Sequence, residues 1–127
     1  MVIHPSDLHF IWAMGRTVVI KSIDSDQNTY LKGHEGRICQ IAISKSGALL
    51  ATGEQMGGEA VCAVIVWDFQ QRDMLYRVRY HTEMVQALSF SFDDAYLVSL
   101  GGVRDGSQLV IWNMNEGRSD ANSPSSN

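Results

Sequence analysis

The sequence predicts an all-β fold made of about two to three repeated four-stranded antiparallel sheets. Apolar residues come in short runs rich in Val, Ile, Leu and Tyr, and clusters of Gly, Ser, Asp and Asn separate these runs. No window keeps the 3.6-residue apolar period of an amphipathic helix. In addition, one pattern of runs and polar residues returns along the chain. Together these observations favour a β-strand repeat architecture over a helical domain.

The runs with the length and composition of β-strands are Leu8–Ala13, Thr17–Ile23, Asn28–Lys32, Arg37–Ile43, Leu49–Gly53, Val61–Trp67, Met74–Tyr80, Val85–Phe90, Tyr96–Leu100 and Leu109–Trp112. Each run is bounded by turn-forming residues, as expected for strands joined by hairpins. The short connections between them favour antiparallel pairing, because a parallel pair needs a crossover of a dozen or more residues.

Two long units carry the same residues in the same order. One begins at His34 and ends at Trp67, and the other begins at His81 and ends at Trp112. The histidines are 81 − 34 = 47 residues apart, and the tryptophans are 112 − 67 = 45 residues apart. A period near 40 to 45 residues with these end residues is typical of WD40 repeats, which form the four-stranded blades of a β-propeller.

Segments inside the two units also match. Ile38–Ser44 matches Val85–Ser91 at an offset of 85 − 38 = 47, and Leu50–Gly53 aligns with Val98–Gly101 at an offset of 98 − 50 = 48. The residues before the first unit are a weaker third copy, in which Lys21 stands where the other copies have Trp. The sequence therefore predicts a WD40-type β-propeller fragment.

This pattern divides the chain into a partial first blade over residues 1–32, a blade over 33–80, a partial blade over 81–114 and a disordered polar tail over 115–127. Only Val2 and Ile3 stand where the first copy needs an opening strand, and no outer strand follows Trp112, so both ends look cut through a blade. A chain this short does not close the ring. We expect the isolated fragment to expose apolar blade faces and to self-associate.

The polar residues that recur with the repeat predict a structural network. In a WD40 blade a His, an inner-strand Ser or Thr and a Trp link by hydrogen bonds, often with an Asp before the Trp strand. The candidates are His34, Thr52 and Trp67 in one unit, and His81, Ser99, Asp105 and Trp112 in the other. The first unit lacks a matching Asp and offers only Glu59, so we expect its network to be incomplete. A catalytic Ser-His-Asp triad is a poor alternative, because a triad has no reason to recur once per blade.

Two loops of matching position, Glu54–Ala60 and Gly102–Gln108, are expected to emerge on one face of the ring. Loops on a rigid scaffold are frequent binding sites. The candidate partner contacts in these loops are Met56, Glu59 and Arg104, joined by Asp105 unless the turn occupies it. Loops without a function are an equally good interpretation.

Composition and motifs disfavour several other classes. The net charge of −4 comes without a basic block, which disfavours nucleic-acid binding, and no apolar run is long enough for a membrane span. Cys39 and Cys62 lie on separate apolar runs and predict neither a disulfide nor a metal site. The glycine pairs lack the spacing of a phosphate loop. We therefore expect a soluble, intracellular, non-enzymatic protein without a cofactor or metal.

Several segments resemble one family within the WD40 proteins: His4-Pro5, Gly15–Ile20, Leu31–His34, Ala42–Gly47, Ile65–Asp68 and Tyr96–Gly102. They are similar to the start of the cilia- and flagella-associated protein 52 family. The resemblance implies a structural component of doublet microtubules in the cytoplasm and cytoskeleton of a cilium or flagellum. Its implied partners are tubulin and other axonemal proteins. The alternative is a generic cytosolic WD40 adaptor that recruits partners to a multiprotein complex.

Overall fold

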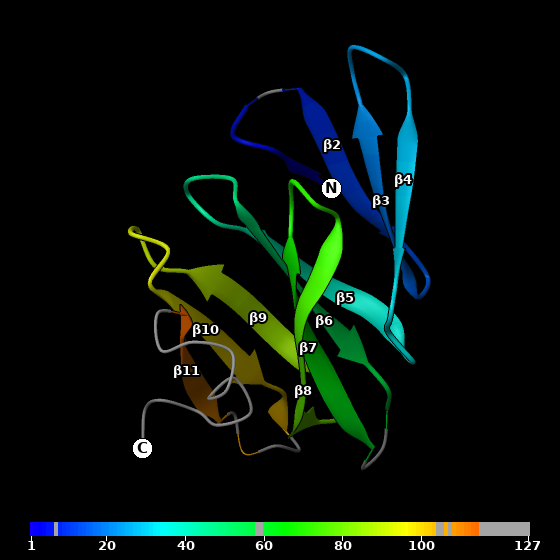
Figure 1. Cartoon of the computed structure of the whole chain (residues 1–127). Helices are drawn as coiled ribbons and strands as arrows, with labels where there is room; N and C mark the ends of the chain where they lie inside the picture. The colour runs from blue at the N-terminus through cyan, green and yellow to red at the C-terminus, as the bar shows by residue number, and fades with distance from the viewer. Residues whose placement is uncertain (7, 58–59, 104–105, 107, 115–127) are drawn as a thin grey trace.

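The computed structural model describes residues 1–6, 8–57, 60–103, 106 and 108–114. Within these residues the chain forms three antiparallel sheets that stack face to face in chain order (Figure 1). The stack is an arc and does not close into a ring. In this part of the chain no helix is long and apolar enough to cross a bilayer.

Each sheet is a meander of consecutive strands. The first sheet has the order β1-β2-β3-β4 and contains β1 (Val2–Ile3), β2 (His9–Met14), β3 (Thr17–Ser22) and β4 (Asn28–Lys32). The second has the order β5-β6-β7-β8 and contains β5 (Arg37–Ile43), β6 (Leu49–Gln55), β7 (Val61–Asp68) and β8 (Asp73–Thr82). The third has the order β11-β10-β9 and contains β9 (Val85–Phe90), β10 (Tyr96–Gly101) and β11 (Leu109–Asn113).

The expected strands are all present, with shifted ends. The largest change is in β8, which extends beyond the expected Tyr80 to Thr82 and takes His81 into the strand. The short β1 does form, because Val2 and Ile3 pair with Ile11 and Phe10 of β2. The polar tail expected over residues 115–127 lies outside the described residues.

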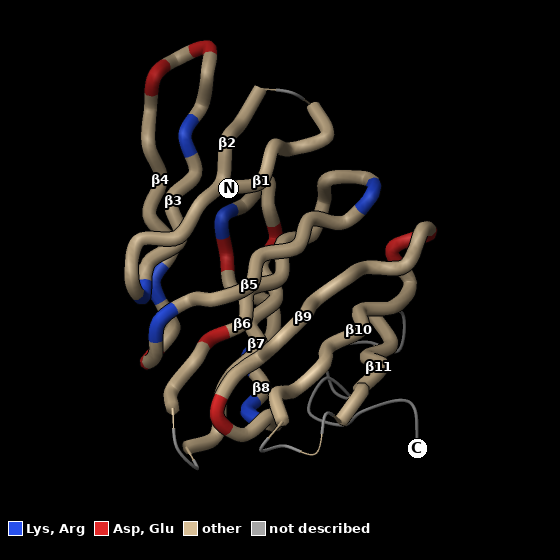
Figure 2. Tube along the Cα trace, turned by 180° about the vertical axis from the view of Figure 1, so that it is seen from behind, with Lys and Arg blue, Asp and Glu red and all other residues tan. Residues whose placement is uncertain are grey.

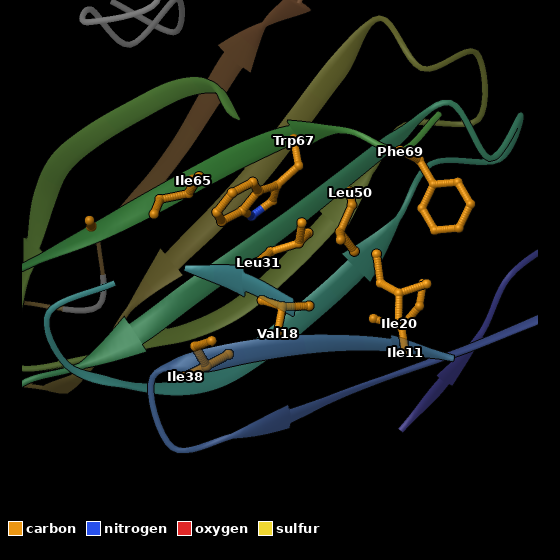
Figure 3. Packing of buried hydrophobic residues seen from close by; sticks show 10 residues of the cluster. Ile11, Val18, Ile20, Leu31, Ile38, Leu50, Ile65, Trp67 and Phe69 are labelled. Carbon is orange, nitrogen blue, oxygen red and sulfur yellow. The ribbon is translucent and has the colours of Figure 1, made fainter. Parts of the chain in front are cut away.

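The second sheet is buried on both faces because it lies between the other two. In β7 the successive residues Ala63, Val64, Ile65 and Val66 are all buried, whereas a strand with one wet face would alternate. Ile65 belongs to the core cluster against the first sheet, together with Ile11, Val18, Ile20 and Leu31 (Figure 3). Val64 and Val66 belong to the core cluster against the third sheet. A continuous apolar run in β7 thus serves two sheet interfaces.

The register of β10 corrects one detail of the sequence alignment. Leu50 lies opposite Trp67 and Leu97 lies opposite Trp112, so the equivalent residues of β6 and β10 are 97 − 50 = 47 apart. The offset of 48 inferred for this segment was wrong. Because side chains alternate between the faces of a strand, the offset of 48 would have placed equivalent residues on opposite faces. At 47, Thr52 and Ser99 are equivalent.

Within the part of the chain that the structure describes, two sheet faces have no neighbouring sheet. The outward face of the first sheet carries Trp12 and Val19 together with Met14 and Tyr30, which are 62% and 55% exposed. The outward face of the third sheet carries Val98, Leu100, Leu109 and Ile111. Charged residues of both signs are scattered along the trace (Figure 2).

Candidate functional site

A buried chain of hydrogen bonds runs through the second sheet. The indole Nε1–H of Trp67 donates to Thr52 Oγ1 at 2.9 Å, and Thr52 Oγ1 lies 2.6 Å from Nε2 of His34. The other ring nitrogen of His34, Nδ1, lies 2.8 Å from Oε1 of Glu54. Donors and acceptors alternate without conflict if Thr52 donates to Nε2 and the imidazole donates from Nδ1. The chain joins β7, β6 and the segment that precedes β5.

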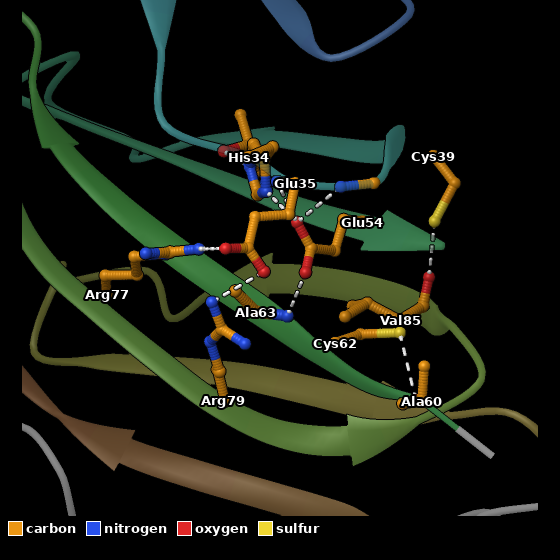
Figure 4. Close-up of polar contacts among 12 residues, drawn as sticks. His34, Glu35, Cys39, Glu54, Ala60, Cys62, Ala63, Arg77, Arg79 and Val85 are labelled. Atoms are coloured by element: carbon orange, nitrogen blue, oxygen red, sulfur yellow. Dashed lines mark hydrogen bonds and ion pairs between the residues drawn. The ribbon is translucent and has the colours of Figure 1, made fainter. Parts of the chain in front are cut away.

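Glu54 was not among the predicted network residues, and its position corrects the prediction of an incomplete network. The unit around Trp67 was expected to have an incomplete network, with Glu59 as its only acidic candidate. Instead Glu54, in β6 and fully buried, closes the network, and it lies in the strand rather than in the expected loop (Figure 4). Glu59 lies outside the described residues.

The carboxylate of Glu54 has a complete set of donors. Oε1 accepts from His34 and from the backbone N–H groups of Glu35 at 3.1 Å and Gly36 at 3.3 Å, and Oε2 accepts from the N–H of Ala63 at 2.8 Å. An ionised carboxylate offers about four acceptor positions, so this arrangement can satisfy a buried negative charge. Glu54 therefore fastens the start of β5 and the start of β7 to β6.

The two ionisable groups of this network have shifted pKa values. Burial lowers the pKa of His34, while Glu54 acts in the opposite direction. For Glu54, burial alone would raise the pKa, but the hydrogen bonds from Ala63, His34 and Gly36 together hold it below its usual value. The pair is therefore a neutral imidazole that donates to an ionised carboxylate.

We predict that Glu54→Gln destabilises the fold by about 1–3 kcal/mol, because an amide nitrogen would face a buried N–H in place of an acceptor. Both folded-state pKa values are lowered, so the unfolded chain binds more protons in acid. The free energy of unfolding should then fall as the pH drops below 6.5, the ordinary value for His, and further below 4.5, that for Glu. Denaturant midpoints from pH 7 to pH 3 should show a smaller slope for the variant.

Glu35→Gln is the matched control, because Glu35 is exposed and pairs at the surface with Arg79 at 2.6 Å and Arg77 at 3.6 Å. A surface pair of this kind contributes about 0–1 kcal/mol. Equal losses for the two variants would contradict the structural role assigned to Glu54.

The third sheet contains the equivalent chain. Trp112 Nε1–H donates to Ser99 Oγ at 2.9 Å, and Ser99 Oγ lies 2.8 Å from Nε2 of His81. Trp112, Ser99 and His81 are all buried. His81 belongs to β8 of the second sheet, so this chain bridges two sheets. Asp105, the fourth expected member, lies outside the described residues.

The first sheet departs from this pattern. Phe10 lies opposite Lys21 as Leu50 lies opposite Trp67, so Lys21 occupies the Trp position and Trp12 occupies the position of Thr52. Both residues are on the outward face of the sheet. Lys21 forms an ion pair with Asp26.

Of the candidate loop contacts, the structure places Met56. It follows β6, is 37% exposed, and its backbone N–H donates to Glu83 O at 2.9 Å, which fixes the loop against the β8–β9 turn. Glu59 and Arg104 lie outside the described residues.

The geometry of the networks favours a structural role. The hydroxyls of Thr52 and Ser99 are fully buried and each bonds both an indole and an imidazole, so neither is presented to a substrate. Among the described residues, no group of three or more His, Cys, Asp or Glu side chains is arranged to hold a metal ion. Neither Cys39 nor Cys62 forms a disulfide with another described residue, and burial raises the pKa of Cys39.

Stacked antiparallel meanders, two of them fastened by a Trp–Ser/Thr–His chain, define a WD40-type β-propeller fold. Residues 25–59 match the family described as WD domain, G-beta repeat. The solved structure of the RRP9 WD40 repeats superposes with a TM-score of 0.76 and 24% identity, over 91% of this chain and 34% of that one. The described chain therefore has a WD40-type propeller fold, and its arc of sheets does not close.

Among curated proteins, the chain is similar to cilia- and flagella-associated protein 52. Identity is 37% to the Bos taurus protein, over 95% of this chain and 19% of that protein. It is 41% to the Homo sapiens protein, over 87% of this chain and 18% of that one. The chain thus spans about a fifth of the length of these relatives.

Proposed function

We propose that the chain is a non-catalytic protein-interaction scaffold and that it serves as a structural component of ciliary or flagellar doublet microtubules. The observation that carries the proposal is the similarity to cilia- and flagella-associated protein 52 along nearly the whole chain. The arrangement of polar groups supports the scaffold role, because the recurring Ser, Thr and His side chains are used inside the sheets. Binding would then depend on the rims and outward faces of a rigid arc.

Tubulin and neighbouring axonemal proteins are the partners we propose. Met56, Glu59 and Arg104 remain proposed contacts on one rim, and residues 33–80 remain the proposed central blade. A partner held by many contacts across a rigid face resists salt better than one held by exposed charge pairs, which about 0.15 M salt already screens beyond roughly 8 Å.

We therefore expect the protein, tagged in ciliated cells, to copurify with axonemes and to stay bound as the salt concentration is raised to about 0.5 M. The measurement is the fraction retained after each extraction step, with a freely diffusing tagged protein as the control for trapping. A protein spread through the cytosol, or absent from washed axonemes, would favour the generic recruiting adaptor.

A further inference from the structure

A pocket opens at the rim where the first and second sheets meet. It lies between the β1–β2 turn of the first sheet and the β5–β6 and β7–β8 turns of the second, which gather at the same end of the molecule (Figure 1). Its lining includes His4, His9, Gly47, Leu49, Phe69 and Arg72. The repeat network uses none of these side chains.

The ring of Phe69 is the centre of this pocket. The imidazole of His4 stacks on it with the centroids 4.0 Å apart and the planes at 20°. The guanidinium carbon of Arg72 lies 4.3 Å from the same centroid. Since His4 occupies one face of the ring, Arg72 lies over the other. His9 meets the ring edge-on, with centroids 5.3 Å apart and planes at 85°.

Both ring nitrogens of His4 form hydrogen bonds, which hold the imidazole in place as one wall of the pocket. Its Nδ1 accepts from the N–H of Ser6 at 3.1 Å, so its proton is on Nε2, which donates to Gly47 O at 2.8 Å. Gly47 has a φ of 84°, and a Cβ there would lie 2.7 Å from the His4 ring. Only glycine both adopts this backbone conformation readily and admits the imidazole at this distance.

Arg72 and His9 are not fully engaged. Arg72 donates from Nη1 to the carbonyl of Phe69, but its buried Nε, like the buried Nδ1 of His9, has no hydrogen-bond partner among the described residues. The ion pairs between described residues also do not include Arg72. Asp68 lines the pocket too, and its Oδ1 accepts from the N–H of Gln71 at 2.9 Å.

Among the described lining residues, the groups of opposite charge are the Arg72 guanidinium and the Asp68 carboxylate, and Asp68 Oδ1 already accepts a hydrogen bond from the N–H of Gln71. Burial lowers the pKa of Arg72, as expected for a cation that has lost water without gaining a carboxylate. Burial first, and then electrostatic effects of which that of Arg72 is the largest, lower the pKa of His9 against the opposite effect of Asp24. His9 is therefore mostly neutral near pH 7, and the guanidinium remains the principal cation.

We propose that this pocket binds a single carboxylate presented by a partner protein, held by the edge of the Arg72 guanidinium and by His9. A guanidinium edge matches a carboxylate in geometry and in unit charge, whereas a dianionic phosphate would exceed the charge available here. The apolar walls at Leu8 and Leu49 suit the methylene stem of a Glu side chain. The acidic chain as a whole, with a net charge of −4, also disfavours polyanions.

The test is steady-state binding of a blocked pentapeptide with one central Glu to the chain, immobilised at low density so that copies do not meet. The same peptide with Gln, and inorganic phosphate, are the comparison ligands. We expect the Glu peptide to bind at least about tenfold more tightly than the Gln peptide, as a charge-assisted pair predicts. Equal affinities for the two peptides, or tighter binding of phosphate, would overturn the proposal.

Variants assign the binding to the pocket. Arg72→Gln should weaken Glu-peptide binding about tenfold, and Arg72→Lys, which keeps the charge without the planar fork, should weaken it a few-fold. Arg16→Gln is the control, because Arg16 is exposed at the far end of β2 from His9, and it should bind as the parent does. Circular dichroism establishes folding of each variant; if Arg72→Gln unfolds, Arg72→Lys decides. Unchanged binding by a folded Arg72 variant would refute the assignment, independently of any ciliary role.

Discussion

The 127 residues expressed alone are expected to self-associate at micromolar concentration instead of forming a stable monomer. Among the described residues, the outward faces of the first and third sheets have no neighbouring sheet, and both carry exposed apolar side chains. Met14 and Tyr30 on one face are 62% and 55% exposed, and Leu109 on the other is 58% exposed. Faces of this kind pack against a neighbouring sheet, because the equivalent surfaces of the second sheet are buried in the two sheet interfaces.

The size of the effect follows from the area. If each face presents about 200 Å² of apolar surface, burial at about 25 cal/mol per Å² corresponds to on the order of 10 kcal/mol for the two faces. That is comparable with the whole stability of a small domain, about 5–15 kcal/mol. Burial of these faces therefore strongly favours association between copies of the chain.

Sedimentation velocity measures this self-association at protein concentrations from about 1 to 100 µM, the range around a micromolar dissociation constant. The variant Met14→Lys with Tyr30→Lys places two charges on the outward face and should shift the population toward monomer. Phe92→Lys is the matched control, because Phe92 is 82% exposed but lies in the β9–β10 turn. A parent chain that is monomeric throughout, with one sharp thermal transition, would contradict the expectation.

The second large effect is expected at Trp112. Its side chain is 4% exposed, packs in the core between the second and third sheets, and donates to Ser99. Trp112→Ala removes a large aromatic group and leaves Ser99 without its donor, which should cost about 3–5 kcal/mol. Denaturant midpoints measured at one low protein concentration give the loss.

Two further variants separate the causes. Trp112→Phe keeps most of the packing and removes the indole N–H, so it should cost about 1–2 kcal/mol, the value of one buried hydrogen bond. Trp12→Ala is the control, because Trp12 is half-buried on the outward face of the first sheet. If Trp112→Ala loses no more stability than Trp12→Ala, the buried role of Trp112 is wrong.

The fold was largely predictable because it is repeated. Two copies of one pattern of runs, with matching His and Trp ends, identify blades even where single strands are ambiguous. The one-residue error in β10 arose at Gly101, which was aligned with Gly53, while the pairing of Leu97 with Trp112 sets the register. A local resemblance of two glycines is weaker evidence than cross-strand pairing.

The burial of Glu54 could have been predicted from its spacing of two residues from Thr52. Thr52 was predicted to belong to the buried network, and residues two apart in a strand share a face, so a strand that continues to Glu54 points its side chain the same way. Charged residues are rarely buried unless they are paired. The partner, His34, was already in the network.

The rim pocket had no comparable signal. His4, Gly47 and Phe69 are brought together by the stacking of two sheets, and no motif relates them along the chain. Arg72 reaches the ring from a turn residue with a φ of 62°. Such a site depends on the relative placement of blades, which a single sequence does not specify.

The position of the hydrogen-bond network along the chain bears on how repeat units are duplicated in the gene. His34, Thr52, Glu54 and Trp67 lie within one sequence unit, yet that unit starts before the sheet it serves and ends before its outer strand. His81 already stands in the second sheet while bonding to the third. A duplicated stretch of this length therefore carries the residues of its own hydrogen-bond network and the contact to the next sheet. A repeat array can then lengthen by gene duplication while each new sheet uses the same kind of interface.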